Sequence, residues 1–242
     1  MVCKNKIIES IIDDFKHKKK FAIAHNGSVA KQEALKRQIL RSNGHSPQTE
    51  EYDILLINSA TMSDADVKLA LENPNVEFGK YAGIIYSPSV QSGLSYDVRD
   101  TIHSIYGIFG NATNSTNDAC QMLHRIRNPI NKQIMVWIDF YNFGAPKPTT
   151  VGAMMKHLKN ARSHIYSNSK DIDTMAIIEK LPFDYNNYGE IEFMQSDILH
   201  EYCINKAEHN LDSILYKKNF IKAQKEYGNT IIYDADKGQK KL

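Results

Sequence analysis

The sequence predicts an α/β fold, in which a mostly parallel sheet is flanked by helices and followed by a mainly helical extension. Short apolar segments typical of buried strands alternate with longer amphipathic segments over the first 145 residues. Helices between consecutive strands supply the crossover connections that parallel pairing needs. With 242 residues, of which 42% are hydrophobic, the chain can bury a sizeable core in one or two domains.

Each expected element follows from its local pattern. Five apolar segments are the expected strands: 21–24, 53–57, 82–86, 103–109 and 133–140. The expected helices of the sheet domain are 4–20, 29–40, 63–71 and 114–127. In the extension we expect helices over 149–167 and 195–227, with a stop at Gly228, a loop at 182–189, a short strand at 230–233 and disorder at 237–242. The expected domains are therefore 1–145 and 146–242.

Charge and cysteine content limit the classes of function. The formal net charge is +2, so a nucleic-acid partner is neither required nor excluded, and any basic surface must be local. The three cysteines are far apart and odd in number, which argues against a disulfide framework or a zinc site and fits a reducing, intracellular compartment. No apolar run approaches 18 residues, so we expect no membrane span. The scattered histidines do not form a metal-ligand spacing with Cys203, so we expect no metal site.

The loop directly after the apolar segment 82–86 is rich in hydroxyl groups. It lies where a strand of a parallel sheet ends, and function gathers at that edge. Its backbone N–H groups and small side chains suit a phosphate. The candidate nucleic-acid contacts in this loop are Ser87, Ser89, Ser92 and Gly93. The alternative is an ordinary polar connection between a strand and a helix.

A second candidate segment is the arginine-containing end of the expected helix 114–127. Gln121 and Arg125 are one turn apart and would share a face, whereas Arg127 would point about 200° away from Arg125 on a regular helix. Pro129 favours a helix end nearby, which could return Arg127 to the same side. Two such arginines can neutralise a transferring phosphoryl group. The alternative is an amphipathic helix with solvated arginines.

A third, weaker segment is the turn after the first expected strand. Asn26 and Ser28 lie in the run His-Asn-Gly-Ser between that strand and the next helix. They could contact a phosphate, but a turn with a helix N-cap explains them equally well.

Together and in this order, the three segments resemble motifs IV, V and VI of superfamily 2 helicases. The closest resemblance is to the replication origin-binding protein helicases of herpesviruses and related giant viruses. Tyr86-Ser87-Pro88-Ser89 followed by Gly93 is similar to the start of that family's motif V. Gln121, Arg125 and Arg127 are similar to its shortened motif VI, and residues 208–231 resemble the helical region after it. The resemblance covers about residues 10–233. Ser87 replaces the usual threonine and His124 replaces the motif VI glycine.

The resemblance implies a RecA-like second lobe of an ATP-dependent DNA helicase of the origin-binding type, acting in viral DNA replication. It implies that Arg125 is the principal arginine finger, with Gln121 beside it at the nucleotide and Arg127 second. It implies DNA contacts for Ser87, Ser89, Ser92, Gly93, Asn26 and Ser28. The expected partners are single-stranded or duplex DNA and an N-terminal RecA-like lobe, in the same gene or in a separate chain. The expected location is the host cell's site of viral replication, in the nucleus or the cytoplasm.

The 242 residues contain neither a Walker A motif, G-x-x-x-x-G-K-[ST], nor an Asp-Glu box after a strand. ATP and Mg²⁺ are therefore expected only together with a first lobe, and the chain alone is not expected to hydrolyse ATP. Two alternatives stay open. One is a stand-alone nucleic-acid-binding module without ATPase activity. The other is an unrelated α/β enzyme, although no nucleophile–base pair in the sequence supports it.

Overall fold

A computed structural model describes residues 1–42, 54–90, 94–111, 114–139, 147–163, 183–185, 191–193 and 196–232. The chain divides into two compact units. The first comprises Met1–Tyr141 together with Tyr216–Leu242, and the second comprises Asn142–Leu215.

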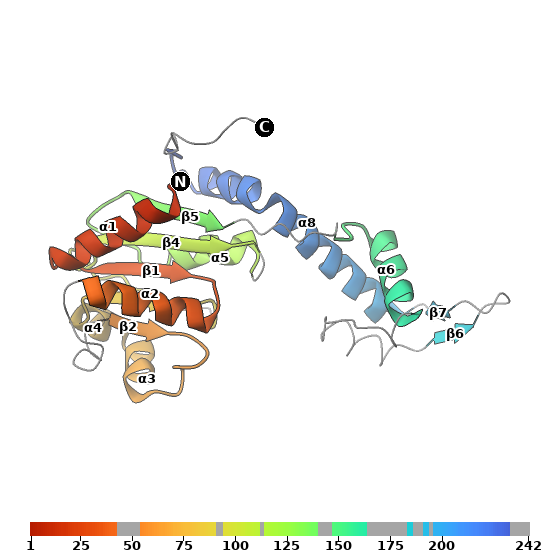
Figure 1. Ribbon diagram of the computed structural model, residues 1–242, viewed down its shortest axis with the longest axis horizontal. Helices are drawn as coiled ribbons and strands as arrows, with labels where there is room; N and C mark the ends of the chain where they lie inside the picture. The colour runs from red at the N-terminus through yellow and green to blue at the C-terminus, as the bar shows by residue number, and fades with distance from the viewer. Residues whose placement is uncertain are drawn as a thin grey trace. The chain divides into compact units, whose positions relative to one another are not determined.

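The first unit contains a five-stranded sheet in which all strands are parallel (Figure 1). Its strands are β1 (Phe21–His25), β2 (Ile54–Ile57), β3 (Gly83–Tyr86), β4 (Ser104–Gly110) and β5 (Ile134–Asp139). Their order is β2-β3-β1-β4-β5, so β1 is the central strand. All five apolar segments are strands, as expected, and the architecture agrees with an α/β, RecA-like fold.

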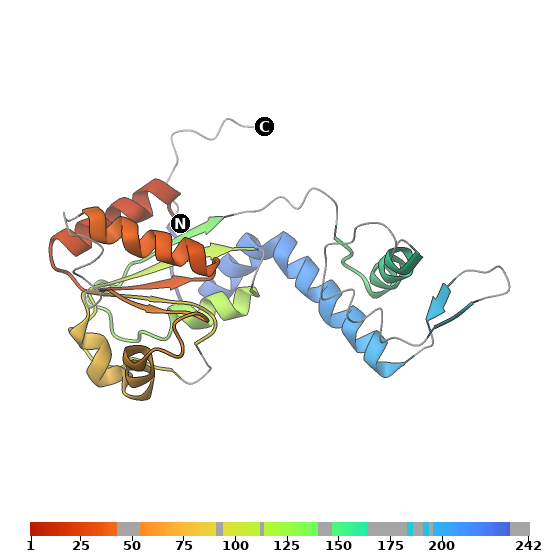
Figure 2. The same ribbon diagram turned by 60° about the horizontal axis from the view of Figure 1, so that its bottom comes forward.

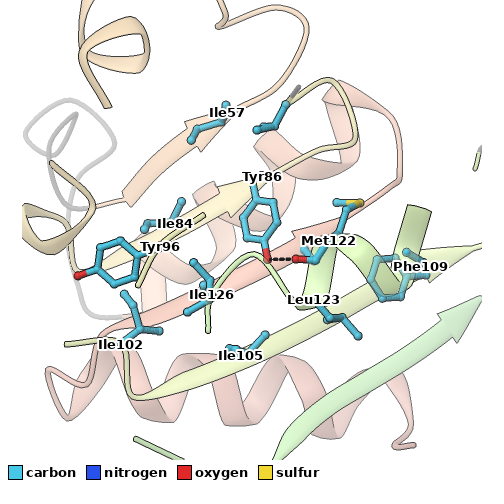
Figure 3. Close-up of a cluster of buried hydrophobic side chains, with 14 of the residues drawn as sticks. Ile57, Ile84, Tyr86, Tyr96, Ile102, Ile105, Phe109, Met122, Leu123 and Ile126 are labelled. Atoms are coloured by element: carbon cyan, nitrogen blue, oxygen red, sulfur yellow. Dashed lines mark hydrogen bonds between the residues drawn. The ribbon is translucent and has the colours of Figure 1, made fainter. Parts of the chain in front are cut away.

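Helices cover both faces of this sheet (Figures 1 and 2). One face carries α1 (Lys4–Lys16) and α2 (Val29–Ser42). The other carries α3 (Ala65–Glu72), α4 (Pro74–Glu77), a 3₁₀ turn at Phe78–Lys80, α5 (Thr116–Leu123) and the C-terminal part of α8 (Asp197–Glu226). The core therefore has two layers, one under each set of helices. Figure 3 shows the α5 layer, in which Tyr86 reaches across to Met122.

Two helices of this unit are shorter than the sequence predicts. The helix expected over 4–20 ends at Lys16, because Lys18 has a positive φ of 56° that does not continue a right-handed helix. The helix expected over 114–127 starts at Thr116 and ends at Leu123. Its start is capped by the side chains of Ser115 and Asp118, which accept hydrogen bonds from each other's backbone N–H groups.

The second unit contains α6 (Val151–Ser163), a two-stranded antiparallel hairpin and the N-terminal part of α8. The hairpin consists of β6 (Phe183–Tyr185) and β7 (Ile191–Phe193), so the loop predicted over 182–189 is wrong where β6 lies. A small core joins α6 to α8 through Met154, Leu158, Leu199 and Cys203.

The end of α8 belongs to the sheet unit. Tyr216 and Phe220 are buried in the core beside α5, and the Phe220 ring lies 5.9 Å from that of Phe109. The expected boundary at residue 145 assigned all of this helix to the extension, whereas the units divide at Tyr141 and again after Leu215. Gly228 follows the helix with a φ of +80°, as expected of a helix stop.

The remaining expectations concern the C-terminus and membranes. Residues 230–232 are not in a strand, so that part of the expected strand is wrong; the tail at 237–242 lies outside the described residues. Within the ranges given above, no helix is both long and apolar enough to cross a bilayer.

Removal of the Phe220 ring tests whether α8 stabilises the sheet. We expect Phe220→Ala to lower the free energy of unfolding by about 3–5 kcal/mol, because it leaves a cavity in a buried aromatic contact. Lys218→Ala, two residues earlier and exposed, should change it by less than about 0.5 kcal/mol. The measurement is denaturant unfolding followed by fluorescence of Trp137, the chain's single tryptophan, on β5. Equal stability of the two variants would contradict the assignment.

Candidate functional site

The candidate residues gather at the carboxyl edge of the sheet. β1 and β3 are neighbours, with Ala24 paired to Tyr86, so the turn after β1 and the loop after β3 begin side by side. Parallel sheets place their binding loops at this edge because all the strands end there.

The loop after β3 begins as a tightly bonded turn. Ser87 is buried, and its N–H donates to the Ile57 carbonyl (2.9 Å). The Ser87 and Ser89 hydroxyls lie 2.5 Å apart, and the Ser89 N–H donates to Ser87 Oγ (3.3 Å). The N–H groups of Ser87 and Ser89 thus have protein partners, unlike the open phosphate cradle that the composition suggested. Ser89 is exposed and keeps its side chain at the surface. Ser92 and Gly93 lie outside the described residues.

A parallel bridge joins this loop to the segment after α5. The Tyr96 N–H donates to the Arg125 carbonyl (2.8 Å), and the Arg127 N–H donates to the Tyr96 carbonyl (3.1 Å). The bridge pairs Tyr96 with Ile126, and Arg125 lies in the turn between the end of α5 and this bridge. Because α5 ends at Leu123, before Arg125, the expected shared helix face of Gln121 and Arg125 is wrong. Ile126, between the two arginines in the chain, is buried.

Arg125 points toward the loop after β3. Its Nη2 donates to the Val90 carbonyl (3.0 Å), while Nη1 is buried and has no hydrogen-bond partner among the described residues. Burial lowers the pKa of the Arg125 guanidinium, and the nearby Tyr86 and Asp118 oppose that shift. Arginine stays charged in proteins, so an unpaired guanidinium nitrogen is a strong donor for an anion.

Tyr86 and the backbone of Arg125 bond to the same carbonyl group of α5. The Tyr86 hydroxyl is buried and donates to the Met122 carbonyl (2.8 Å) in the last turn of α5 (Figure 3). The Arg125 N–H donates to the same carbonyl (3.3 Å). Burial raises the pKa of Tyr86 far above its usual range, so the hydroxyl keeps its proton and remains a donor.

The other two residues of the arginine segment are at the surface. Arg127 is exposed and its Nε lies 3.4 Å from Asp97 Oδ1. Asp97 also accepts a hydrogen bond from Ser95, and its carbonyl accepts one from Asn128. Gln121 is exposed on α5. The sequence argument missed Tyr96 and Asp97, although both lie in the hydroxyl-rich stretch that it selected.

In the turn after β1, one predicted residue is buried and the other is exposed: Asn26 bonds to Gly110, and Ser28 lies at the surface. The Asn26 side chain continues the pairing of β1 with β4: Nδ2 donates to the Gly110 carbonyl (2.9 Å), and Oδ1 accepts from the Gly110 N–H (2.7 Å). Asn26 is therefore a structural residue at this position. Ser28 is exposed, and its carbonyl accepts the first hydrogen bonds of α2. Gln32 closes the turn by donating to the carbonyls of His25 and Gly27.

His25 is the buried titratable group of this turn. Its Nδ1 accepts the Gly27 N–H (2.8 Å), and a Cβ at Gly27 would lie only 2.4 Å from the ring. Desolvation and the charges of Lys31 and Lys4 lower the pKa of His25 from 6.5 to about 4. The ring is thus neutral at physiological pH and carries its proton on Nε2.

Over the described ranges, no group of three or more His, Cys, Asp or Glu side chains could hold a metal ion. No protein-family model matches the chain, and no curated protein sequence matches it significantly.

The neutral state of His25 makes stability depend on pH. Its pKa is lower in the folded chain than the usual 6.5, so its contribution is complete above pH 6.5 and is lost as the pH falls toward 4. The loss amounts to about 3 kcal/mol. We expect NMR titration to give a pKa near 4 for the His25 ring and His25→Gln to reduce the loss of stability between pH 7 and 4.5. A ring that titrates near 6.5 would refute the burial argument.

Proposed function

We propose that this chain is the second RecA-like lobe of a superfamily 2 DNA helicase of the origin-binding type, acting in viral DNA replication. The observation that carries the proposal is Arg125, which leaves the end of α5, bonds the loop after β3 and keeps one guanidinium nitrogen without a protein partner. The family and the viral role come from the sequence resemblance, and the parallel sheet order supports the lobe type.

Arg125 acts in this proposal as the arginine finger. Its planar fork contacts two oxygens of a phosphoryl group, and the charge stabilises the transition state. Val90 and Tyr86 hold the arginine in place, which reduces the entropy lost when it engages the nucleotide. A first lobe brings ATP and Mg²⁺, and this chain supplies Arg125, with Arg127 and Gln121 nearby. Arg127 must leave Asp97 to reach a phosphate.

The nucleic-acid track runs along the ends of β1 and β3. Ser28 and Ser89 are exposed at these neighbouring ends, where hydroxyl groups can donate to backbone phosphates. Ser87 positions Ser89 through their short contact. Ser92 and Gly93 continue the track in the sequence resemblance. Contacts to the backbone alone give binding without sequence preference.

The first test measures binding to a fluorescent single-stranded oligonucleotide by anisotropy at several salt concentrations. We expect weak binding that falls steeply with salt, because counterions are released from the phosphates. Ser89→Ala should weaken it about three- to tenfold, the effect of losing one typical hydrogen bond. Thr101→Ala is the matched control, since Thr101 precedes β4 at the opposite edge. An affinity that changes neither with salt concentration nor on Ser89→Ala would contradict the proposed nucleic-acid track.

The second test measures ATP hydrolysis with and without a Walker A-bearing first lobe joined to the chain. Alone, the chain should show only background turnover. In the joined protein Arg125→Lys should lower kcat by about 10³-fold or more, because an ammonium cannot replace the fork, while DNA binding persists. Arg127→Lys should have a smaller effect. An unchanged kcat in Arg125→Lys would refute the finger. DNA binding without any stimulated hydrolysis would favour the stand-alone binding module.

A further inference from the structure

The opposite face of the sheet holds a separate pocket of about 380 Å³, here named the α1–α2 pocket. It lies between α1, α2 and the carboxyl ends of β1, β4 and β5. The residues that matter for its chemistry are Lys4, His25, Lys31, Leu35, Trp137 and Asp139. All of them belong to the first unit. Arg125 belongs to the other face, with α5.

Lysines occupy the first turns of both helices at this pocket, where acidic residues are usual. Neither α1 nor α2 has an acidic residue in its first turn, and lysines stand there instead: Lys4 in α1 and Lys31 in α2. Cations at a helix N-terminus oppose the helix dipole, so folding alone does not favour them. Both dipoles and both lysines attract an anion into the same space. Among the described residues of the pocket lining, Asp139 is the one carboxylate.

His25 is a buried side chain of the pocket lining. The residue is only 6% exposed, and it lines the pocket. Its Nδ1 accepts the Gly27 N–H, which leaves the proton on Nε2. An anionic oxygen in the pocket could accept a hydrogen bond from this N–H.

The other side of the pocket is apolar and aromatic. Trp137 is half-buried, and Ile8, Leu35 and Ile108 add aliphatic surface beside it. Lys4 Nζ lies 5.3 Å from the centroid of the Trp137 ring, so the cation and the aromatic surface adjoin. Asp139 is two residues after Trp137 on β5, so the two share a side of the strand.

We propose that the α1–α2 pocket binds a nucleoside 5′-phosphate. The phosphate lies against Lys4, Lys31 and His25 Nε2 at the helix starts, and the base stacks on Trp137. The Asp139 carboxylate accepts a hydrogen bond from an amino group of the base. The volume is within the range of small-molecule sites, roughly 300–1,000 Å³. The proposal goes beyond the helicase role, because the ligand is either a free nucleotide or the terminal nucleotide of a DNA strand.

The test uses the fluorescence of Trp137, the only tryptophan in the chain. We titrate the full chain with deoxyadenosine 5′-monophosphate, deoxyadenosine and inorganic phosphate. The monophosphate should quench the emission saturably, and deoxyadenosine should bind at least about tenfold more weakly, since it lacks the charge-assisted hydrogen bonds. Lys31→Ala should weaken monophosphate binding about three- to tenfold. Lys16→Ala, an exposed lysine in the last turn of α1, is the matched control.

A second readout follows the His25 ring by NMR, and its resonances should shift when the monophosphate binds. A 5′-phosphorylated oligonucleotide that displaces the monophosphate, where its 5′-hydroxyl counterpart does not, identifies a strand end; otherwise the ligand is a free nucleotide. The pocket is refuted if there is no saturable quenching, if His25 does not respond, or if Lys31→Ala and Lys16→Ala behave alike. Ser89→Ala and Arg125→Lys should leave monophosphate binding unchanged, so failure of the pocket and failure of the helicase proposal are separable.

Discussion

The parallel bridge between Tyr96 and Ile126 is the contact on which the arginine site depends. Its two hydrogen bonds tie the segment that follows the turn at the end of α5 to the loop after β3. Ile126 then points into the core, and Arg125 lies beside the loop after β3. Had the helix continued, it would have separated Arg125 from Arg127 by more than half a turn. The position of the arginines is therefore set by a tertiary pairing rather than by helix periodicity.

The central position of β1 explains why two candidate sites lie at one edge of the sheet. Its pairing with β3 brings the turn after β1 next to the hydroxyl-rich loop, and its pairing with β4 extends through the Asn26 side chain to Gly110. On one face the edge leads to Arg125, and on the other to His25 and the α1–α2 pocket. Preorganised donors of this kind lose little entropy on binding.

Apolar periodicity predicted the five strands well, because a buried parallel strand needs a continuous apolar run and tolerates little else. It predicted helix ends poorly: α5 ends at Leu123, where a distant partner, Tyr96, takes over the hydrogen bonds. No local signal encodes that partner. Asn26 shows the same limit, since an amide in a polar turn suggests a ligand contact but here pairs with Gly110, 84 residues away. The adjacency of β1 and β3 could be expected from the sequence, whereas the meeting of His25 and Trp137 in one pocket is seen only in the structure.

Cationic groups placed against the usual folding preference occur at both candidate sites. A sequence selected for stability alone would place acids, not lysines, at the starts of α1 and α2. It would also pair Nη1 of Arg125, which is buried without a partner among the described residues, with an acceptor. In both places a cationic group stands where an anionic oxygen would offset its cost, and this shared feature supports the phosphate ligands that we propose for the two sites.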